Sequence, residues 1–418
     1  MISYLNSKKI LKEGIIKIKD ESILSINSFN RISSSNVYSK FDYPSGNNAA
    51  FDGYAINSKD TKNLNKDKFK AFKIIGSIAA GRQPFKKKIK KFEAVEIMTG
   101  GIIPKGFDTI IPNEQIKYYP DNKTRKYILI SRGVGSYNHV RFAGSDYKKK
   151  ELIIKKNTII LPNHILALKT LGIKKIKVKK KINILFFSTG NEISNSDKIP
   201  NWKVRNSNSH YIKNLEGNFL FHFKNGGILK DNHRKIFKMK LKKMLNSKID
   251  IIVTSGAVSA GKYDFIPDIV KTFKLSNFFK SVAIRPGKPV LFAKIKNKQK
   301  AVFGLPGNPM SSVACFRFFV YPYISNILGL SEEKPIKAIL KNEFTKTKNF
   351  TRFAKSELST TKNGKIEVEI LKGQESFRIK SFVKSNIWAL LPSGKSKFRK
   401  GEIIDCYIAN FPNQTLIL

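Results

Sequence analysis

The chain has 418 residues, of which 41% are hydrophobic, and a formal net charge of +49. This length predicts two to four domains, and this apolar fraction excludes a chain that is disordered throughout. The charge would suit a nucleic-acid binder, but the lysines are spread through predicted strands, helices and loops instead of forming a basic stripe. We interpret most of the excess as coding bias on a solvated surface that still attracts anions, and we expect no specific nucleic-acid partner.

Cysteine and histidine usage excludes several kinds of site. Cys315 and Cys406 are far apart and outside any CxxC pattern, which excludes a disulfide framework and a thiolate metal site. The five histidines form no HExxH pattern, which argues against a zinc hydrolase. The N-terminus lacks an apolar signal segment, and the most apolar stretch, 316–330, contains Arg317 and is too short to span a bilayer. We expect a cytoplasmic protein with no membrane partner.

The first part of the chain is predicted to mix helix and strand. Apolar residues spaced three and four apart indicate helix in residues 1–42. From 43 to 146, short β-like runs alternate with Gly, Pro and Asn, which indicates a β-rich unit inserted into another domain. Residues 147–181 return to strand and helix, and Pro162 is placed to open a helix that Gly172 ends.

The pattern changes at residue 182 to alternating strands and helices. Strands are predicted at 182–187, 250–254, 282–285, 290–293 and 301–305, and helices at 208–223, 233–246, 264–273 and from Pro309. This alternation is typical of a doubly wound, mostly parallel sheet. Helices are lost after residue 330, and period-two runs such as 366–370 indicate a small β-barrel or sandwich. The fold class is therefore α/β and multidomain.

Polar residues follow the predicted strands of this sheet where each strand ends. In doubly wound sheets these ends meet at one rim, and ligands bind there. The loops concerned are 188–192, 230–232, 255–264, 285–289 and 305–309. Their small residues allow backbone N–H groups to approach an anion.

Charged residues on these loops predict the chemistry of the rim. Asp231, Asp264 and Glu192 are hard oxygen ligands suited to Mg²⁺. Arg285 and Lys288 can hold an oxyanion. Each residue also has a purely structural interpretation, as a turn, a helix cap or a surface charge, but all of them converge on one rim. The residue types therefore predict magnesium-assisted chemistry on a phosphate-bearing anion.

Seven segments, in order, resemble the molybdopterin molybdenumtransferases, the family that includes the C-terminal domain of gephyrin. They are Ala49–Ala55, which is similar to the SAMDGYA signature, Met98–Asp108, Val140–Asp146, Thr189–Glu192, Ser255–Asp264, Arg285–Pro289 and Leu305–Pro309. The resemblance implies four domains. They are an elongated, discontinuous N-terminal domain (1–42 and 147–181), an inserted β-rich domain (43–146), a molybdopterin-binding α/β domain (182–330) and a C-terminal β-barrel domain (331–418).

The resemblance also implies a reaction, in which Mg²⁺-dependent insertion of molybdate into adenylylated molybdopterin releases AMP. It implies a homodimer whose active site is completed by the partner's first two domains, with an adenylyltransferase and apo-molybdoenzymes as further partners. The implied catalytic residues are Asp52, Thr99, Asp146, Glu192, Lys280 and Arg285, and the implied metal ligands are Asp231 and Asp264. The implied substrate-binding residues are Ser255, Gly256, Ser259, Lys288, Pro289, Pro306, Gly307, Asn308, Ser311, Arg352 and Ser376.

Several positions depart from the family's pattern. Arg285 stands for a lysine and keeps the charge with a different geometry. Asn206 and Asn232 each stand for an aspartate, and the second change puts more weight on Asp231 as a metal ligand. Ala257 stands for a glycine, which predicts a turn that avoids positive φ. Glu375 stands for a glycine beside Ser376, where its carboxylate would repel molybdate unless it points away.

Three other functions are weighed against this one. A molybdopterin adenylyltransferase shares the α/β domain, but it usually stands as one small domain with a Gly-Gly-Thr-Gly loop, unlike residues 255–259 and the extra domains here. A scaffold role is disfavoured by the intact acidic and basic residues of the rim. A nucleic-acid binder is disfavoured by the diffuse charge. The choice between molybdate and tungstate stays open.

Overall fold

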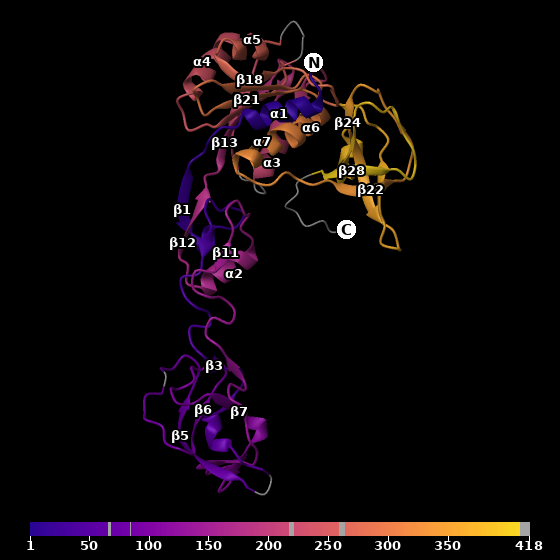
Figure 1. The fold of residues 1–418 in the computed structure, drawn as a ribbon. Coiled ribbons are helices and arrows are strands. Elements are labelled where there is room, and N and C mark those ends of the chain that lie inside the picture. The colour runs from indigo at the N-terminus through magenta and orange to yellow at the C-terminus, as the bar shows by residue number, and fades with distance from the viewer. Residues whose placement is uncertain (66–67, 84, 217–220, 259–263, 410–418) are drawn as a thin grey trace.

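The computed structural model describes residues 1–65, 68–83, 85–216, 221–258 and 264–409. The molecule is elongated (Figure 1). An α/β part and a barrel lie beside each other at one end, a β-rich part lies at the other end, and a smaller part formed by two chain segments lies between them. No helix of the described residues is long and apolar enough to cross a membrane.

A six-stranded sheet forms the centre of the α/β part, in the order β16-β13-β17-β21-β20-β18. Its strands are β13 (Ile182–Thr189), β16 (Phe221–Leu229), β17 (Ile251–Ser255), β18 (Leu275–Phe279), β20 (Leu291–Ile295) and β21 (Ala301–Leu305). The strands β16, β13, β17 and β21 run parallel, and β20 is antiparallel to both of its neighbours. Because β13 is first in the chain but lies between β16 and β17, the winding reverses there, and this switch point is where such sheets bind ligands.

Helices cover both faces of this sheet. One face packs against α1 (Tyr4–Glu13), α3 (Ser207–Leu215) and a continuous helical segment made of α6 (Pro309–Cys315), a π-helical turn (Phe316–Val320) and α7 (Tyr321–Ile327). The other face packs against α4 (Arg234–Met244) and α5 (Ile266–Lys271). The doubly wound sheet predicted from the alternating pattern is therefore confirmed.

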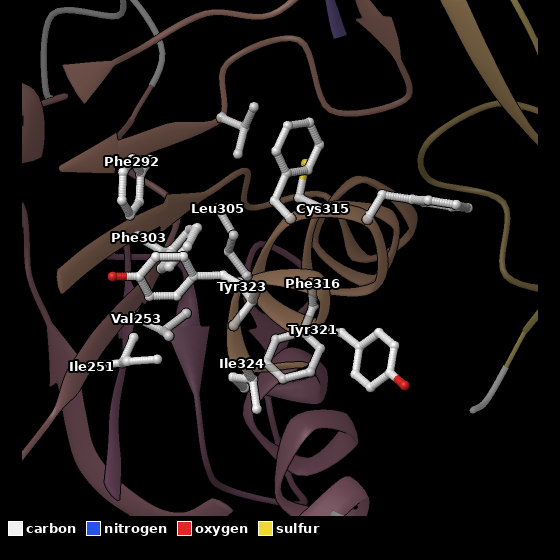
Figure 2. Close-up of a cluster of buried hydrophobic side chains, with 14 of the residues drawn as sticks. Ile251, Val253, Phe292, Phe303, Leu305, Cys315, Phe316, Tyr321, Tyr323 and Ile324 are labelled. Carbon is white, nitrogen blue, oxygen red and sulfur yellow. The ribbon is translucent and has the colours of Figure 1, made fainter. Parts of the chain in front are cut away.

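Alternation along the strands explains why the sheet is covered on both faces. Ile184 and Phe186 of β13 belong to one hydrophobic cluster, while Leu185 and Phe187 belong to the other. Successive side chains of a strand point to opposite faces, so a continuous apolar run buries both. Figure 2 shows the first cluster, in which side chains from β17, β20 and β21 face those of the helical segment that carries Phe316.

The β-rich part contains a second six-stranded sheet, in the order β7-β4-β6-β5-β9-β8. Its strands are β4 (Gly53–Ile56), β5 (Lys70–Ile78), β6 (Glu93–Ile97), β7 (Thr109–Pro112), β8 (Lys117–Tyr119) and β9 (Tyr127–Ile130). The chain enters and leaves this part at one place, where β3 (Asn48–Ala49) pairs with β10 (Val140–Arg141). Next to that pair, Tyr43 and Tyr147 exchange backbone hydrogen bonds of 2.7 and 3.0 Å.

The prediction of helix throughout residues 1–42, made from apolar spacing, is wrong beyond the first turns. The first helix ends at Glu13, and Gly14 caps it. Beyond it, β1 (Asp20–Leu24) pairs with β12 (Lys175–Lys179), and β2 (Val37–Tyr38) pairs with β11 (Leu152–Ile154). Pairing with a segment more than 100 positions away outweighs the local helical spacing, as tertiary contacts commonly do. The helix predicted at Pro162 is confirmed as α2 (Pro162–Thr170).

The C-terminal part is a closed five-stranded barrel, because β24 pairs with both β25 and β26. Its strands are β22 (Ile336–Leu340), β24 (Thr351–Thr360), β25 (Ile366–Ile370), β26 (Ile387–Leu391) and β28 (Ile403–Ile408), with α8 (Lys380–Lys384) beside β24 and a short outer pair β23 (Phe344–Thr345) and β27 (Lys397–Phe398). Of the two architectures that the period-two runs left open, the barrel is correct.

Two further sequence predictions need correction. The helix expected over 208–223 ends at Leu215, and residues 221–223 begin β16 instead. The strand expected at 282–285 is reduced to β19 (Ile284–Arg285), which pairs with β24 of the barrel and not with the central sheet. Both errors arise where a short apolar run has no local signal for which partner it will join. The second one matters for the site, because it carries Arg285 onto the barrel.

Candidate functional site

A cavity of about 750 Å³ opens at the switch point of the central sheet. It is lined by the ends of β13, β17 and β21 and by the loops that follow them, including Thr189, Ser255 and Pro306. The loop after β16 contributes Asp231. The loops predicted to meet after β13, β16, β17 and β21 therefore do meet at this rim.

The backbones of two of these loops touch directly. The Thr189 hydroxyl donates a hydrogen bond of 2.9 Å to the carbonyl of Ser255. Gly256 has φ of +100°, and a Cβ at this position would lie 2.4 Å from Thr189 Oγ1. Glycine is required here both by conformation and by space.

The turn beside Gly256 contradicts one expectation. Ala257 has φ of +54°, in the left-handed region that its replacement of glycine was predicted to avoid. The turn keeps two successive positive φ angles, and alanine tolerates this region at a cost of roughly 1–2 kcal/mol. The shape of the loop is therefore retained despite the substitution.

Asn208 is a cavity residue that sequence reasoning did not single out. Its side-chain amide donates to Ser255 Oγ at 2.7 Å and to the carbonyl of Gly307 at 2.8 Å. It thereby ties the N-terminal turn of α3 to the loops after β17 and β21. Its place in the Asn206-Ser207-Asn208 element was the available signal.

Asn206 shows why an amide replaces an acid at its position. It is 5% exposed, accepts a hydrogen bond of 2.6 Å from Ser188 Oγ, and donates one of 2.9 Å to Asn195 Oδ1. A carboxylate could not donate to Asn195 and would be buried without a counter-charge. This departure from the family pattern is therefore a structural one.

The three predicted carboxylates Glu192, Asp231 and Asp264 line this one cavity. Within the described ranges, no group of three His, Cys, Asp or Glu side chains is close enough to form a metal site alone. Mg²⁺ commonly takes one or two carboxylates and completes its shell with phosphate and water, so this donor set fits a metal shared with a phosphate-bearing ligand.

Two lysines brace the acidic loop. Lys203 Nζ donates to the carbonyl of Asn191 at 2.6 Å, and Lys230 Nζ donates to the carbonyl of Ile193 at 3.2 Å. The β14 (Ile193–Ser194) and β15 (Val204–Arg205) pair closes the same loop. The Asp231 backbone N–H reaches Asn191 Oδ1 at 3.3 Å. The loop that carries Glu192 is thereby fixed against the loop that carries Asp231.

A second cavity, of about 840 Å³, lies between the α/β part and the barrel. Its lining includes cations and hydroxyls from both parts, among them Arg285, Lys288, Ser311, Lys346, Arg352 and Ser376, and one carboxylate, that of Glu375. The pairing of β19 with β24 sets Arg285 directly beside Arg352. The two cavities share the lining residues Pro289, Pro306, Asn308 and Phe377, so they are two ends of one site.

The guanidinium of Arg352, a residue that lines the second cavity, lacks a hydrogen-bond partner for one of its nitrogens. Its Nη2 donates to the carbonyl of Gln374 at 2.6 Å, but its Nε is buried and has no hydrogen-bond partner. Burial, and next the charge of Arg285, lower the pKa of Arg352, while Glu375 opposes the shift. A bound anion would supply both the missing acceptor and the missing negative charge.

Glu375, the acid expected to repel an oxyanion, has a partner of its own. Its Oε2 lies 3.1 Å from Nε of Arg378 in an ion pair. The neighbouring Ser376 Oγ accepts a hydrogen bond of 3.1 Å from Asn308 Nδ2, which joins the barrel loop to the end of β21. The Glu375 charge is thus partly neutralised by Arg378.

The remaining predicted residues lie elsewhere. Asp52, Thr99 and Asp146 are exposed and line neither cavity. They belong to the β-rich part of the chain, which lies away from the α/β part (Figure 1). Lys280 follows β18, is exposed, and does not line either cavity in the described part of the chain. Ser259 lies outside the described residues.

Comparison with known families gives matches along nearly the whole chain. The model of the "MoeA N-terminal region (domain I and II)" matches residues 2–172. The model of the "Probable molybdopterin binding domain" matches residues 186–326. The model of the "MoeA C-terminal region (domain IV)" matches residues 337–408.

Individual relatives agree with these matches. A molybdopterin molybdenumtransferase of Staphylococcus aureus is 31% identical over 383 residues, covering 90% of this chain and 88% of that protein. One of Staphylococcus epidermidis is 29% identical over 416 residues, covering 98% and 96%. The crystal structure of the molybdopterin biosynthesis moeA protein from Pyrococcus horikoshii OT3 superposes with a TM-score of 0.80 at 26% identity, covering 98% of this chain and 100% of that one.

Proposed function

Because the chain belongs to the MoeA family of molybdopterin molybdenumtransferases, enzymes of molybdenum cofactor biosynthesis, we propose that it inserts molybdate into adenylylated molybdopterin in a Mg²⁺-dependent reaction that releases AMP. One observation carries this proposal. A pocket with carboxylates and a pocket with cations share the wall formed by Pro289, Pro306, Asn308 and Phe377. A substrate with phosphates at one end can therefore meet an oxyanion at the other.

The acidic pocket is assigned to the phosphate end of the substrate. Gly256 and Ala257 line this pocket, and such small residues let backbone N–H groups of a loop approach phosphate oxygens. Asp231 and Asp264 would hold Mg²⁺, with Glu192 lining the same pocket, and the ion would neutralise phosphate charge there. Asn208 keeps Ser255 in place beside this end.

The cationic pocket is assigned to molybdate. Arg285, Lys288 and Arg352 provide positive charge, and the hydroxyls of Ser311 and Ser376 can donate hydrogen bonds. Arg352 supports this assignment, because the residue lines the cavity and its buried Nε has no hydrogen-bond partner. Holding molybdate beside the substrate raises its effective concentration at the reacting sulfurs.

We further propose that the functional unit is a homodimer with shared active sites. Asp52, Thr99 and Asp146 line neither cavity of their own subunit, so the partner subunit's β-rich part would supply them. Lys280 stays in the proposal as a catalytic residue and Ser259 as a substrate-binding residue. The expected partners are the adenylyltransferase that makes the substrate and the apo-molybdoenzymes that receive the product, all in the cytoplasm.

The proposed domain boundaries are 1–42 with 147–181, 43–146, 182–330 and 331–418. Separate hydrophobic clusters support the inserted domain and the barrel as units, one around Ile110 and one around Val368. A larger cluster joins Leu11, Ile184 and Phe353, so the helix at the N-terminus and part of the barrel pack against the α/β domain.

The test is AMP release from adenylylated molybdopterin by the purified protein. AMP release should require Mg²⁺ and molybdate together, and the product should activate an apo-molybdoenzyme. Asp231→Asn and Asp264→Asn should each reduce AMP release by at least ~100-fold while leaving the fold unchanged, since removal of one charge-stabilising group commonly costs 10²–10³-fold. Consumption of ATP with release of pyrophosphate would instead identify an adenylyltransferase. Absence of both reactions from the folded protein would leave a scaffold.

A further inference from the structure

Lys355 is a buried cation next to the proposed oxyanion site. It lies on β24, three positions after Arg352, and is 2% exposed. Its Nζ donates to the carbonyls of Gly373 at 2.7 Å, Arg378 at 2.8 Å and Glu375 at 3.3 Å. All of these acceptors belong to one loop, residues 373–378, which connects the barrel to α8.

The main chain of Lys355 holds the same loop. Its N–H donates to Gln374 Oε1 at 3.0 Å, and its carbonyl accepts from Gln374 Nε2 at 2.7 Å. The 373–378 loop is therefore tied to β24 by both the side chain and the backbone of one residue.

This use of a lysine is unusual because a buried ammonium is costly unless it is compensated. Its three N–H donors have three carbonyl acceptors, and no carboxylate forms an ion pair with it among the described residues. Hydrogen bonding to the loop therefore compensates the charge in part, and the loop is held by a charged donor that is stronger than a neutral one.

The loop that Lys355 holds carries the hydroxyl of the cationic pocket. Ser376 is bonded on its other side to the residues after β21, through Asn308 Nδ2 at 3.1 Å and through the Met310 N–H, which donates to its carbonyl at 3.2 Å. Arg352 holds the same loop through the carbonyl of Gln374. Lys355 thus lies on the barrel side of the loop while the cavity lies on the other.

We propose that Lys355 is a positioning residue for oxyanion binding: its buried ammonium holds the 373–378 loop so that Ser376 faces the cavity beside Arg352. This inference rests on the proposed function, because it takes the cavity to be the molybdate site. Lys355 itself does not line the cavity, so its proposed role is exerted through the loop.

The test compares Lys355→Met, Lys355→Arg and a matched control, Lys362→Met, in the full-length protein. Lys362 is an exposed lysine just beyond the far end of β24.

Molybdate affinity is measured by equilibrium dialysis, and hydrogen exchange is followed at the amides of Met310 and Arg378. We expect Lys355→Met to weaken molybdate binding by at least ~10-fold and to speed exchange at both amides, because a displaced binding group of this kind commonly costs one to two orders of magnitude. Lys355→Arg should bind more tightly than Lys355→Met, and Lys362→Met should match the unaltered protein.

Wild-type affinity in a folded Lys355→Met protein would overturn the proposal. So would equal losses in the Met and Arg variants with unchanged exchange at Met310 and Arg378. If Lys355→Met does not fold, Gln374→Ala releases the same loop with Lys355 in place, and it should show the same two effects at smaller size, whereas unaltered binding would refute the inference. If the unaltered protein binds no molybdate, the proposed function fails, and the exchange data alone decide whether Lys355 holds the loop.

Discussion

Thr99 donates two hydrogen bonds to one carboxylate oxygen of Asp52, from its backbone N–H at 2.6 Å and from its hydroxyl at 2.7 Å. Both residues are exposed. The backbone bond, followed by the hydroxyl bond, lowers the pKa of Asp52. The inserted domain therefore presents a fixed, ionised carboxylate to its surroundings without burying it.

Thr99→Val should raise the pKa of Asp52 toward its ordinary value, because it removes the hydroxyl bond and keeps the backbone bond. A carboxyl group with a lowered folded-state pKa adds stability above its unfolded pKa, and this stability is lost as pH falls through the folded pKa. The Thr99→Val variant should therefore lose this stability at a higher pH than the unaltered protein. The acidic limb of the pH profile of AMP release should also shift to higher pH. Carboxyl carbon NMR titration measures the change. Asp121 serves as the control. Hydrogen bonds from Thr124 and Lys123 lower its pKa in the same way, and the substitution at Thr99 should leave that pKa unchanged.

Mixed dimers should distinguish a shared active site from two separate ones. Asp52→Ala and Asp231→Ala should each be inactive alone. If each site takes Asp231 from one subunit and Asp52 from the other, random reassociation of equal amounts restores about a quarter of the sites. The measurement is AMP release after mixing, with each variant mixed with itself as the control. If verified heterodimers recover no AMP release, Asp52 does not act across the interface.

Molybdate affinity should fall as pH rises through about 8. Burial, followed by the charge of Arg352, lowers the pKa of Lys355 to about 8, with Arg378 adding to the shift and Glu375 opposing it. Only the ammonium form of Lys355 holds the 373–378 loop, so bound oxyanion favours that form. Deprotonation above about pH 8 should therefore weaken molybdate binding.

The free energy of unfolding should change in the opposite direction. Between about pH 8 and the ordinary lysine pKa, the folded state binds fewer protons than the unfolded state, so stability should rise with pH over that window. Binding and unfolding should both be measured from pH 6.5 to about 9.5. Lys355→Met should remove both trends, and persistence of the affinity trend in that variant would assign it to another group.

Gly256→Ala should destabilise the protein, whereas Ala257→Gly should be nearly neutral. Gly256→Ala places a methyl group against Thr189 at positive φ, so it should cost about 1–3 kcal/mol of stability and reduce AMP release by more than ~10-fold. Ala257→Gly relieves roughly 1–2 kcal/mol of backbone strain and adds about 0.5–1 kcal/mol of unfolded-state entropy, so its net effect should stay within about 1 kcal/mol. Denaturant unfolding measures both. Equal destabilisation by the two changes would contradict the loop geometry.

Sequence patterns predicted the central sheet well because its strands are buried on both faces. The run Ile182–Phe187 is apolar except for Asn183, and such runs have few alternatives to a covered parallel strand. The extended segment at Asp20–Leu24 was assigned wrongly to helix, because its strand partner at Lys175–Lys179 is far away in the sequence. Local spacing carries no information about such a pairing.

The site was predictable to the extent that its residues follow strands. Asp231 and Ser255 could be placed on one rim from strand order alone. Lys355 could not, because it is one of many lysines and only its burial against the 373–378 loop distinguishes it. Ala257 was misjudged since the loop geometry, and not the residue type, fixed its φ.

Both chain connections to the inserted domain pass through one joint. There Tyr43 and Tyr147 exchange two backbone hydrogen bonds, and the N–H groups of Gly144 and Asp146 donate to the carbonyls of Pro44 and Tyr43. A rotation at this joint would move Asp52 and Thr99 together, because two hydrogen bonds join them. In the proposed homodimer, the reach of that carboxylate toward the partner subunit's cavity would therefore depend on the stiffness of the joint.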